Sequence, residues 1–327
     1  MAPPIVPGHL RGVCLLLFAA NTVNQNQRGD YYPKRWLPHS FNQIYTRSEP
    51  GESPPSYCTV FLHMVKCAGS TVKHALRRSS YLDGVSKPVS CRHDMGGAPE
   101  CIEGLKSATV ISTSGPGSYG QLVRDSLHDS GRSCEYFTMM REPVDRLISA
   151  FFYCPADHKM PQVRPPELCG QHPSEIPAKE RLLKFAQTIW KNKAFMQLSI
   201  GIDCPPHAVC NESSIGDYIS LDSAERREAM DNVQGLLSTY RAVGIMEYFD
   251  LSMELFHARV KSPVRNWRKL TIHNQGQSWK TREEVLQWAR QSPEIHRAIE
   301  ADLLLYGYAV DLFKNQTYEA LGTLWEE

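Results

Sequence analysis

Two short polar turns carry the residues whose types and spacing could bind an anion. The first turn is VKCAGST, in which Lys66 supplies a mobile positive charge. The other residues that could approach an anion closely or donate hydrogen bonds to it are Ala68, Gly69, Ser70 and Thr71. Their order differs from the G-x-x-x-x-G-K-[ST] of an ordinary nucleotide-binding loop. Taken alone, this turn is equally consistent with a tight strand-to-helix connection that carries a solvated lysine.

The second turn is MREPVDRLISAFF, which begins with Arg141. A guanidinium at this position can bind a phosphate through two hydrogen bonds. Pro143 suits the first position of a helix, and Ser149 follows two turns later. The alternative is that Arg141 pairs with Glu142 or Asp145 and that Ser149 is an ordinary surface hydroxyl.

Both turns follow segments that are predicted to be strands. The apolar and β-branched runs that predict strands lie at 59–64, 107–113, 135–140 and 242–246. Because helical patterns alternate with them, we expect an α/β fold in three layers, P-loop-like, with a central mostly parallel sheet flanked by helices. Ligands bind at the carboxyl ends of parallel strands, where helix N-termini offer free N–H groups. The two turns should therefore meet at one edge of the sheet.

Further helices are predicted on both sides of the fourth strand. Apolar residues at helical spacing place one helical face on Leu182, Phe185, Ile189, Met196 and Ile200. The segments 222–240, 247–260 and 292–310 have helical patterns as well. Asp222 with Glu225 three residues later matches a capping box at the start of the first of these. No internal repeat is present in the sequence.

The overall charge argues against one large class of partners. Lys and Arg total 36, and Asp and Glu total 35, in a chain of 327 residues. Such a balance gives no general attraction to nucleic acid, so we expect no nucleic-acid partner.

The N-terminus and the cysteines favour the secretory pathway. A short apolar run at 13–20 follows Arg11, which is typical of a signal peptide or a short signal anchor; a cytosolic tail is the alternative. Of the ten cysteines, Cys14 lies in this leader and Cys67 in the first turn, and the other eight can pair. Pairs that disulfides could join are Cys91 with Cys101, Cys154 with Cys169, Cys204 with Cys210, and Cys58 with Cys134 across two neighbouring strand starts. A zinc site is the alternative, although the sequence has no C-x-x-C. Sequons at Asn211 and Asn315 add modest support.

The two turns together resemble the Golgi-type carbohydrate sulfotransferases, in particular the heparan and dermatan uronyl 2-O-sulfotransferase-like branch. That family has roughly F-L-H-x-P-K-x-A-G-[ST]-T, followed by R-[DE]-P-x-x-R-x-x-S-x-[FY]. This chain has FLHMVKCAGST and REPVDRLISAF in the same order and on the same expected elements. The downstream segments AVGIMEYFDLSMELF and ADLLLYGYAVDLF are also similar, so the resemblance covers about residues 57–315.

The resemblance implies the co-substrate PAPS (3′-phosphoadenosine 5′-phosphosulfate), a glycan acceptor and no metal. Residues that would hold the 5′-phosphosulfate are Lys66, Ala68, Gly69, Ser70 and Thr71. Arg141 and Ser149 would hold the 3′-phosphate. Lys66 would also be catalytic, because it can neutralise the charge that builds on the leaving oxygen. His63 matches a family histidine with a structural or loop-positioning role.

A base should take the proton of the acceptor hydroxyl. Family members often have a histidine just after the second strand, where this chain has VISTSGPGSYG without one. The candidates for the base are His93 with Asp94, His128, Tyr119 and Glu142, and His93 is chosen as the catalytic prediction. Val65 and Cys67 replace the proline and the threonine that are usual in the family, and Cys67 is either a small filler or a reactive thiol.

These inferences predict a signal peptide or anchor at 1–24, a stem at 25–56, a sulfotransferase domain at 57–315 and a tail at 316–327. The expected location is the Golgi lumen, with membrane contact only through a possible N-terminal anchor. A non-catalytic relative that binds PAPS or a glycan is the alternative function. A kinase is a weaker one, because the ordinary phosphate loop and a magnesium-binding carboxylate are lacking. The sequence leaves the acceptor sugar and the oligomeric state open.

Overall fold

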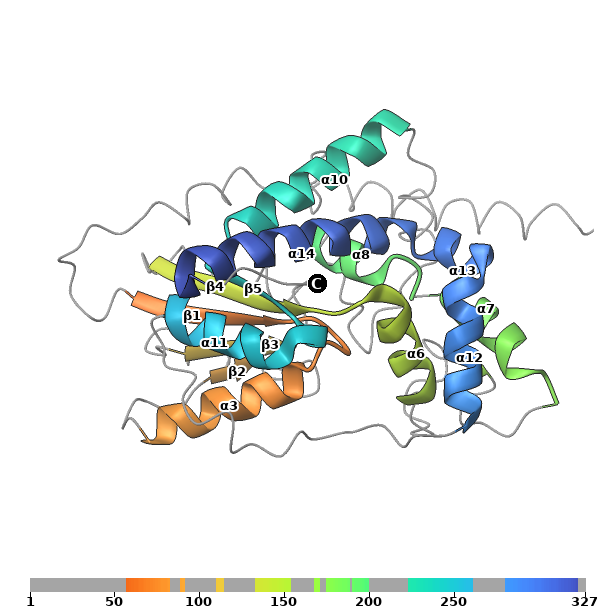
Figure 1. The fold of residues 1–327 in the computed structure, drawn as a ribbon, viewed down its shortest axis with the longest axis horizontal. Coiled ribbons are helices and arrows are strands. Elements are labelled where there is room, and N and C mark those ends of the chain that lie inside the picture. Colours follow the sequence, from red (N-terminus) through yellow and green to blue (C-terminus); the bar gives the residue numbers. More distant parts are fainter. Residues whose placement is uncertain are drawn as a thin grey trace, which may run out of the picture.

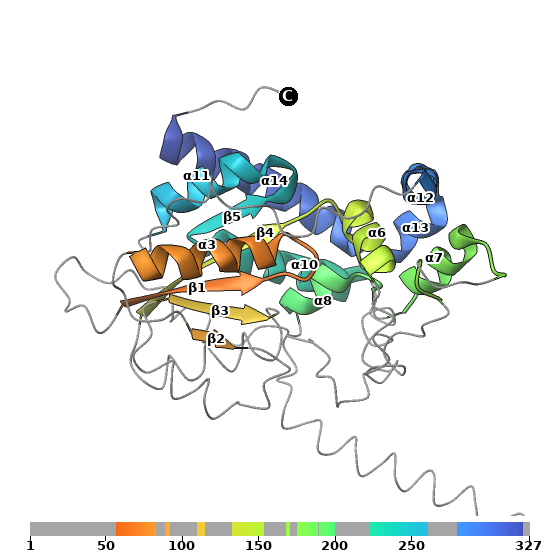
Figure 2. The same ribbon diagram turned by 90° about the horizontal axis from the view of Figure 1, so that it is seen from below.

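The chain folds around a five-stranded parallel sheet (Figures 1 and 2). The structure is a computed structural model that describes residues 57–82, 89–91, 110–114, 133–153, 168–170, 175–188, 190–199, 223–260 and 280–322. The strands are β1 (Tyr57–His63), β2 (Val89–Cys91), β3 (Val110–Ser114), β4 (Ser133–Met140) and β5 (Ala242–Ile245). Their order across the sheet is β2-β3-β1-β4-β5. The predicted α/β fold with a central parallel sheet between helices is confirmed.

The central strand β1 pairs in parallel with β3 on one side and with β4 on the other. Its side chains are buried on both faces of the sheet, as continuous apolar strands of parallel sheets require; Val60, Phe61 and Leu62 have no exposed surface. The chain leaves β1 toward the β2 side and later crosses to β4. The carboxyl end of β1 is therefore beside a change of direction in the strand order, which is where ligands bind in open α/β sheets.

Helices lie on both faces of the sheet. Figure 1 shows α3 (Gly69–Leu82) below it, and α10 (Ser223–Ser238) and α14 (Glu300–Leu321) above it. The helix α11 (Phe249–Arg259) packs beside β5, and α8 (Lys193–Ser199) contacts α10 and α14. The buried side chains of these helices and the sheet form one apolar core.

A second apolar core lies beyond the carboxyl ends of the strands. It is built by α6 (Pro143–Tyr153), α7 (Ala178–Ala186), α12 (Lys280–Gln291) and α13 (Pro293–Ala298), which Figures 1 and 2 show grouped at one end of the sheet. Phe151 is at its centre and packs edge-on against Phe152 and Phe185. Because α6 starts directly after β4, this core fixes the direction in which the second polar turn leaves the sheet.

Two predicted helices are each divided into two. The face predicted from Leu182 to Ile200 is wrong as one helix, since α7 ends at Ala186 and α8 begins at Lys193. Between them Asn192 has a φ of 46°, and its side-chain oxygen accepts the N–H of Ala301 at 3.0 Å. The segment 292–310 is likewise broken at Ile299, between α13 and α14. Of the residues predicted on the first face, Ile189 and Ile200 lie outside the described residues.

Two elements were not predicted, and one is longer than predicted. The sequence did not indicate β2 or α12. The helix α14 continues past residue 315, the expected end of the domain, to Leu321. Gln316 is buried there and joins the sheet, because its side chain accepts the N–H of Val243 and donates to the carbonyl of Tyr240. Among the described residues, no helix has both the length and the apolar character needed to span a membrane; the predicted leader and stem lie outside them.

The predicted cross-strand disulfide between Cys58 and Cys134 is confirmed. The two residues are register partners in β1 and β4, with Cα atoms 4.4 Å apart. Cys169 is disulfide-bonded as well. Cys101, Cys154, Cys204 and Cys210 lie outside the described residues, so the other expected pairs stay predictions.

Candidate functional site

The turn between β1 and α3 has a strained backbone. Lys66 and Ala68 have φ values of 66° and 55°, in the left-handed region that residues with a side chain rarely adopt. Each such residue costs about 1–2 kcal/mol. The turn is held by hydrogen bonds from the N–H of Cys67 to the carbonyl of Met64, at 3.3 Å, and from the N–H of Thr71 to the carbonyl of Ala68, at 2.9 Å. Strain of this kind is concentrated at functional sites, which makes the turn a candidate for one.

Gly69 is required by the position of the His63 imidazole. A Cβ atom at residue 69 would lie 2.5 Å from the Cγ atom of His63 and closer still to two other ring atoms. The ring stacks on Phe61, with centroids 6.2 Å apart. The strand-end histidine therefore packs directly under the turn, in keeping with the loop-positioning role predicted for it.

The strained turn leaves backbone donors at the start of α3. Within the described part of the chain, the N–H groups of Ala68, Gly69 and Ser70 have no acceptor. The first N–H groups of any helix lack partners inside the helix, and the helix dipole adds partial positive charge there. Ser70 is exposed, so the start of α3 is open to solvent and can receive an anion.

The second turn meets the first through Arg141. Its Nη1 atom donates to the backbone carbonyl of Lys66 at 3.3 Å. Within the described residues, Arg141 forms no ion pair, and its buried Nε has no acceptor. The alternative, in which Arg141 pairs with Glu142 or Asp145, is not what the structure shows. A half-buried guanidinium with an unused donor beside an open helix N-terminus favours binding of an anion.

The side chain of Lys66 points toward α6. Its Nζ atom lies 3.3 Å from the centroid of the Tyr153 ring, a cation–π contact with a largely exposed aromatic residue. Ser149 is half-buried and lies one helical turn before Tyr153, on the same side of α6. The structure therefore brings Lys66 and Arg141 into contact, and it places Ser149 on the helix that Lys66 approaches.

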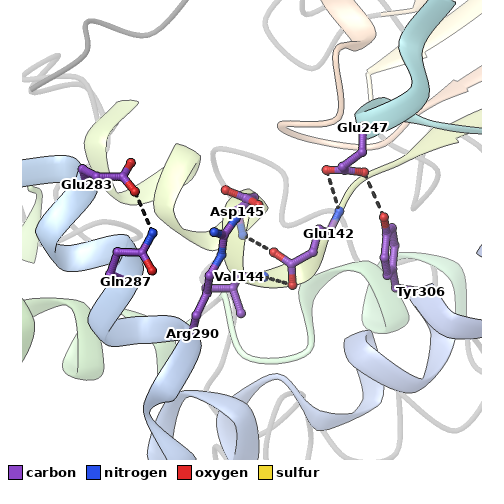
Figure 3. Close-up of polar contacts among 8 residues, drawn as sticks. All are labelled: Glu142, Val144, Asp145, Glu247, Glu283, Gln287, Arg290 and Tyr306. Atoms are coloured by element: carbon purple, nitrogen blue, oxygen red, sulfur yellow. Dashed lines mark hydrogen bonds and ion pairs between the residues drawn. The ribbon is translucent and has the colours of Figure 1, made fainter. Parts of the chain in front are cut away.

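Glu142 caps α6 with both of its carboxylate oxygens. They accept the N–H of Val144 at 3.0 Å and the N–H of Asp145 at 2.6 Å (Figure 3). Burial raises the pKa of Glu142, against the two backbone hydrogen bonds that lower it. Asp145 pairs with Arg290 of α12 at 2.9 Å. Glu142 thus has a structural task at the helix start, which weakens its candidacy as the catalytic base.

A carboxylate that the sequence analysis did not single out also lies at this edge of the sheet. Glu247 stands on the short 3₁₀ turn η4 (Met246–Tyr248) that follows β5. It accepts the backbone N–H of Glu142 at 3.1 Å and the hydroxyl of Tyr306, from α14, at 2.9 Å (Figure 3). Its position directly after a predicted strand was a usable signal for Glu247. Nothing in the sequence indicated that Tyr306 would reach it.

A buried ion pair connects α6, which carries the second turn, to neighbouring helices. Arg146 of α6 binds Asp302 of α14, and both side chains are almost completely buried. The second oxygen of Asp302 accepts the N–H of Phe195 at 2.7 Å. Removing one member would leave the other as an uncompensated buried charge, which is strongly unfavourable. The pair therefore locks α6, α8 and α14 together.

Cys67 is a buried small residue of the first turn. Its burial raises the pKa of the thiol to about 12, although the nearby charges of Arg146 and Arg141 lower it. The sulfur contacts the carbonyl of Val65 at 3.6 Å. Of the two predictions for Cys67, the small filler is favoured over the reactive thiol.

The remaining candidate bases, His93, Asp94, Tyr119 and His128, lie outside the described residues, and their roles stay predictions. Among the described residues, no group of His, Cys, Asp and Glu side chains is arranged to hold a metal ion. Neither a protein-family model nor a curated protein matches the chain.

Proposed function

We propose that this protein is a PAPS-dependent carbohydrate sulfotransferase that moves a sulfuryl group from PAPS to a hydroxyl of a glycan. The observation that carries the proposal is the contact between the two motif turns, in which Arg141 donates to the carbonyl of Lys66. The turns are far apart in the sequence, and each is ambiguous alone. Together they offer two kinds of anion-binding group at one edge of the sheet, which is what a donor with phosphate groups at both ends requires.

The available groups suit the donor. The open N–H groups at the start of α3, with Ser70 and Thr71, would hold the 5′-phosphosulfate, and the dipole of α3 favours its charge. Arg141 has an unused buried donor for the 3′-phosphate, and Ser149 would add a hydroxyl. PAPS supplies an activated sulfuryl group whose leaving group is a phosphate.

Lys66 would act on the leaving group. Its ammonium group already lies between the strained turn and α6, against the Tyr153 ring. When it leaves the Tyr153 ring it can neutralise charge on the bridging oxygen, an effect commonly worth several kcal/mol in a site that excludes water. The ring would then be the resting contact of Lys66 in the absence of the donor.

The experiment incubates the purified protein with sulfur-labelled PAPS and oligosaccharides that present uronic acid, galactose and hexosamine hydroxyls. Binding of the desulfonated product PAP is measured separately by calorimetry. We expect PAP binding and label transfer to at least one acceptor. Lys66→Ala should remove most of the transfer while the unfolding temperature stays within a few degrees of wild type.

Lys184→Ala is the matched control, because the side chain of Lys184 is exposed and pairs with the exposed Glu180 on α7. Equal activity of Lys66→Ala and Lys184→Ala would contradict the role of Lys66. Absence of both PAP binding and transfer in the wild type would refute the proposed function. PAP binding without turnover would instead support the non-catalytic relative.

A further inference from the structure

We propose that Glu247 is the general base that takes the proton of the acceptor hydroxyl, and that Tyr306 positions it; this rests on the proposed sulfotransferase function. Transfer of a sulfuryl group to a hydroxyl requires a group that takes the hydroxyl proton. Four described carboxylates follow β4 and β5 within five residues: Glu142, Asp145, Glu247 and Asp250. Within the described residues, Asp250, in the first turn of α11, has no hydrogen bond to the β4–α6 turn, and of the other three only Glu247 is not already committed to another charge or to a helix end.

Elimination among these three rests on their partners. Glu142 uses both oxygens on the N–H groups of α6, and Asp145 is paired with Arg290. Glu247 is exposed and, within the described residues, forms no ion pair. It receives one hydrogen bond on each oxygen. Because each carboxylate oxygen can accept two, one acceptor position stays available on each for an incoming hydroxyl.

The position of Glu247 agrees with the donor site. Its carboxylate contacts the N–H of Glu142, which directly follows Arg141, and the Arg141 guanidinium reaches the Lys66 carbonyl. The negative charge of Glu247 also raises the pKa of the Cys67 thiol, which lies inside the first turn. The Glu247 carboxylate and Lys66, which is proposed to neutralise the leaving group, are thus both linked to the β4–α6 turn at the same edge of the sheet.

The turn that carries Glu247 is fixed by α11. The hydroxyl of Ser252 accepts the N–H of Ile245 and donates to the carbonyl of the same residue, both at 2.8 Å. Gly244 leaves no space for a side chain there, since an added Cβ would lie 2.6 Å from Phe256. A base must be held in one orientation, and this end of β5 is held by two buried hydrogen bonds.

Tyr306 completes the arrangement. Burial raises the pKa of its hydroxyl first, and the neighbouring Glu247 charge raises it further. The phenol therefore keeps its proton and remains a donor to Glu247. A base oriented by a third group is the arrangement that activates hydroxyl nucleophiles in many enzymes. Among the described residues, the titratable or charged groups near Glu247 are Tyr306 of α14, Glu142 and Arg141 of the β4–α6 turn, Cys67 of the β1–α3 turn, and Tyr248 on its own turn.

In the proposed sulfuryl transfer, each bond formed or broken and the transferred proton are accounted for. The acceptor oxygen forms a bond to sulfur while the bond between sulfur and the bridging phosphate oxygen breaks. The electron pair of the broken bond stays on that oxygen, next to Lys66, and PAP leaves. The acceptor proton passes to the Glu247 carboxylate and then to solvent, to which this residue is exposed.

The test compares Glu247→Gln, Tyr306→Phe and the control Asp250→Asn. Asp250 is exposed in the first turn of α11, so the control makes the same acid-to-amide change nearby. We expect Glu247→Gln to lower kcat for glycan transfer by about 100- to 10,000-fold, the usual range for a lost general base. PAP affinity, measured by calorimetry, should change less than threefold. Asp250→Asn should retain wild-type kcat.

Tyr306→Phe and chemical rescue give a second readout. Tyr306→Phe removes the hydroxyl that orients the Glu247 carboxylate, so kcat should fall while KM for the glycan stays close to the wild-type value. Glu247→Ala should regain activity with added formate.

Each other outcome is decisive. Unchanged kcat in Glu247→Gln, or a loss of PAP affinity equal to the loss of kcat, overturns the assignment of the base while leaving the proposed function standing. If Glu247→Gln fails to fold, an unchanged kcat in Tyr306→Phe overturns it. A wild type that binds PAP but neither sulfates a glycan nor speeds PAPS hydrolysis overturns it as well. Absence of PAP binding refutes the proposed function itself.

Discussion

Gly69→Ala should destabilise the fold, and the reason is a single neighbouring ring. The new Cβ atom would lie 2.5 Å from Cγ of His63 and nearer to two other atoms of the imidazole, whereas real Cβ atoms essentially never approach within 3.0 Å of another heavy atom. The ring cannot move freely, because it stacks on Phe61, which is completely buried. The substitution therefore forces the end of β1 and the start of α3 apart.

The magnitude follows from two opposing effects. Overpacking of a tight site costs about 1–3 kcal/mol. Without a clash, alanine in place of glycine would stabilise by about 0.4–1 kcal/mol, because it restricts the unfolded chain. We expect a net loss of up to roughly 2.6 kcal/mol from these two ranges. For a chain of this size the corresponding fall in Tm is up to roughly 10 °C.

The assay is a double-mutant cycle with His63→Ala, measured by urea unfolding followed by circular dichroism. His63→Ala removes every ring atom that the new methyl would meet. In that background Gly69→Ala should become neutral or stabilising, so the sign of its effect changes. The coupling free energy between the two positions should be at least about 1 kcal/mol.

Additive effects of the two substitutions, within about 0.5 kcal/mol, would refute the reasoning, because they would show that the imidazole does not occupy the space beside residue 69. A destabilisation by Gly69→Ala that persists in the His63→Ala background would locate its cause in the backbone of the turn instead.

Three further predictions concern the disulfide, the thiol and the buried ion pair. Replacing Cys58 and Cys134 together by alanine opens a link across a sequence separation of 76, and the unfolding free energy measured in urea should fall by about 4.5 kcal/mol in the chain-entropy model. Burial raises the pKa of Cys67 to about 12, so the native thiol should resist iodoacetamide at pH 8 and react at least ~100-fold faster in urea, as followed by mass spectrometry. Because this folded-state pKa lies above the ordinary thiol value of 9.0, the bound proton contributes stability that is lost as pH rises from about 9 to about 12, and Cys67→Ala should lessen that loss. Asp302→Asn should cost about 3–5 kcal/mol by leaving Arg146 buried without its partner, whereas Asp302→Leu combined with Arg146→Met should recover most of it; equal losses in the single and the double variant would contradict the role of the ion pair.

Local patterns were sufficient for four of the five strands of the sheet. The strands β1, β3, β4 and β5 have long apolar or β-branched runs, and α6 has Pro143 at its first position. The strand β2 has only three residues and follows a proline, which is too little for a periodic signal. The helix α12 is mostly polar and buries a narrow stripe, Val285, Leu286 and Ala289. Its stability comes from the neighbouring helices, a source that its own sequence does not contain.

The helix break at Asn192 depends on the same kind of distant partner. Apolar spacing continued across it, but its side chain caps α14 by accepting the N–H of Ala301. That contact joins residues that only the folded chain brings together, so periodicity could not indicate it. At the site, the rule that ligands bind at strand ends was sufficient to predict that Lys66 and Arg141 lie together. It could not predict which carboxylates would be committed to helix ends and ion pairs.

The strained turn between β1 and α3 depends both on its own sequence and on a contact with a residue distant in the sequence. An ordinary phosphate loop relies on glycines for unusual backbone angles, whereas here Lys66 and Ala68 take left-handed angles at a cost of about 1–2 kcal/mol each. Such angles persist only where surrounding contacts hold them, and Arg141 supplies one by binding the Lys66 carbonyl. Arg141 thereby fixes the direction of the N–H groups at the start of α3 as well as offering its own free donor. Its loss should therefore weaken both ends of the proposed donor site at once, through a hydrogen bond to the backbone that lysine at the same position cannot replace in geometry.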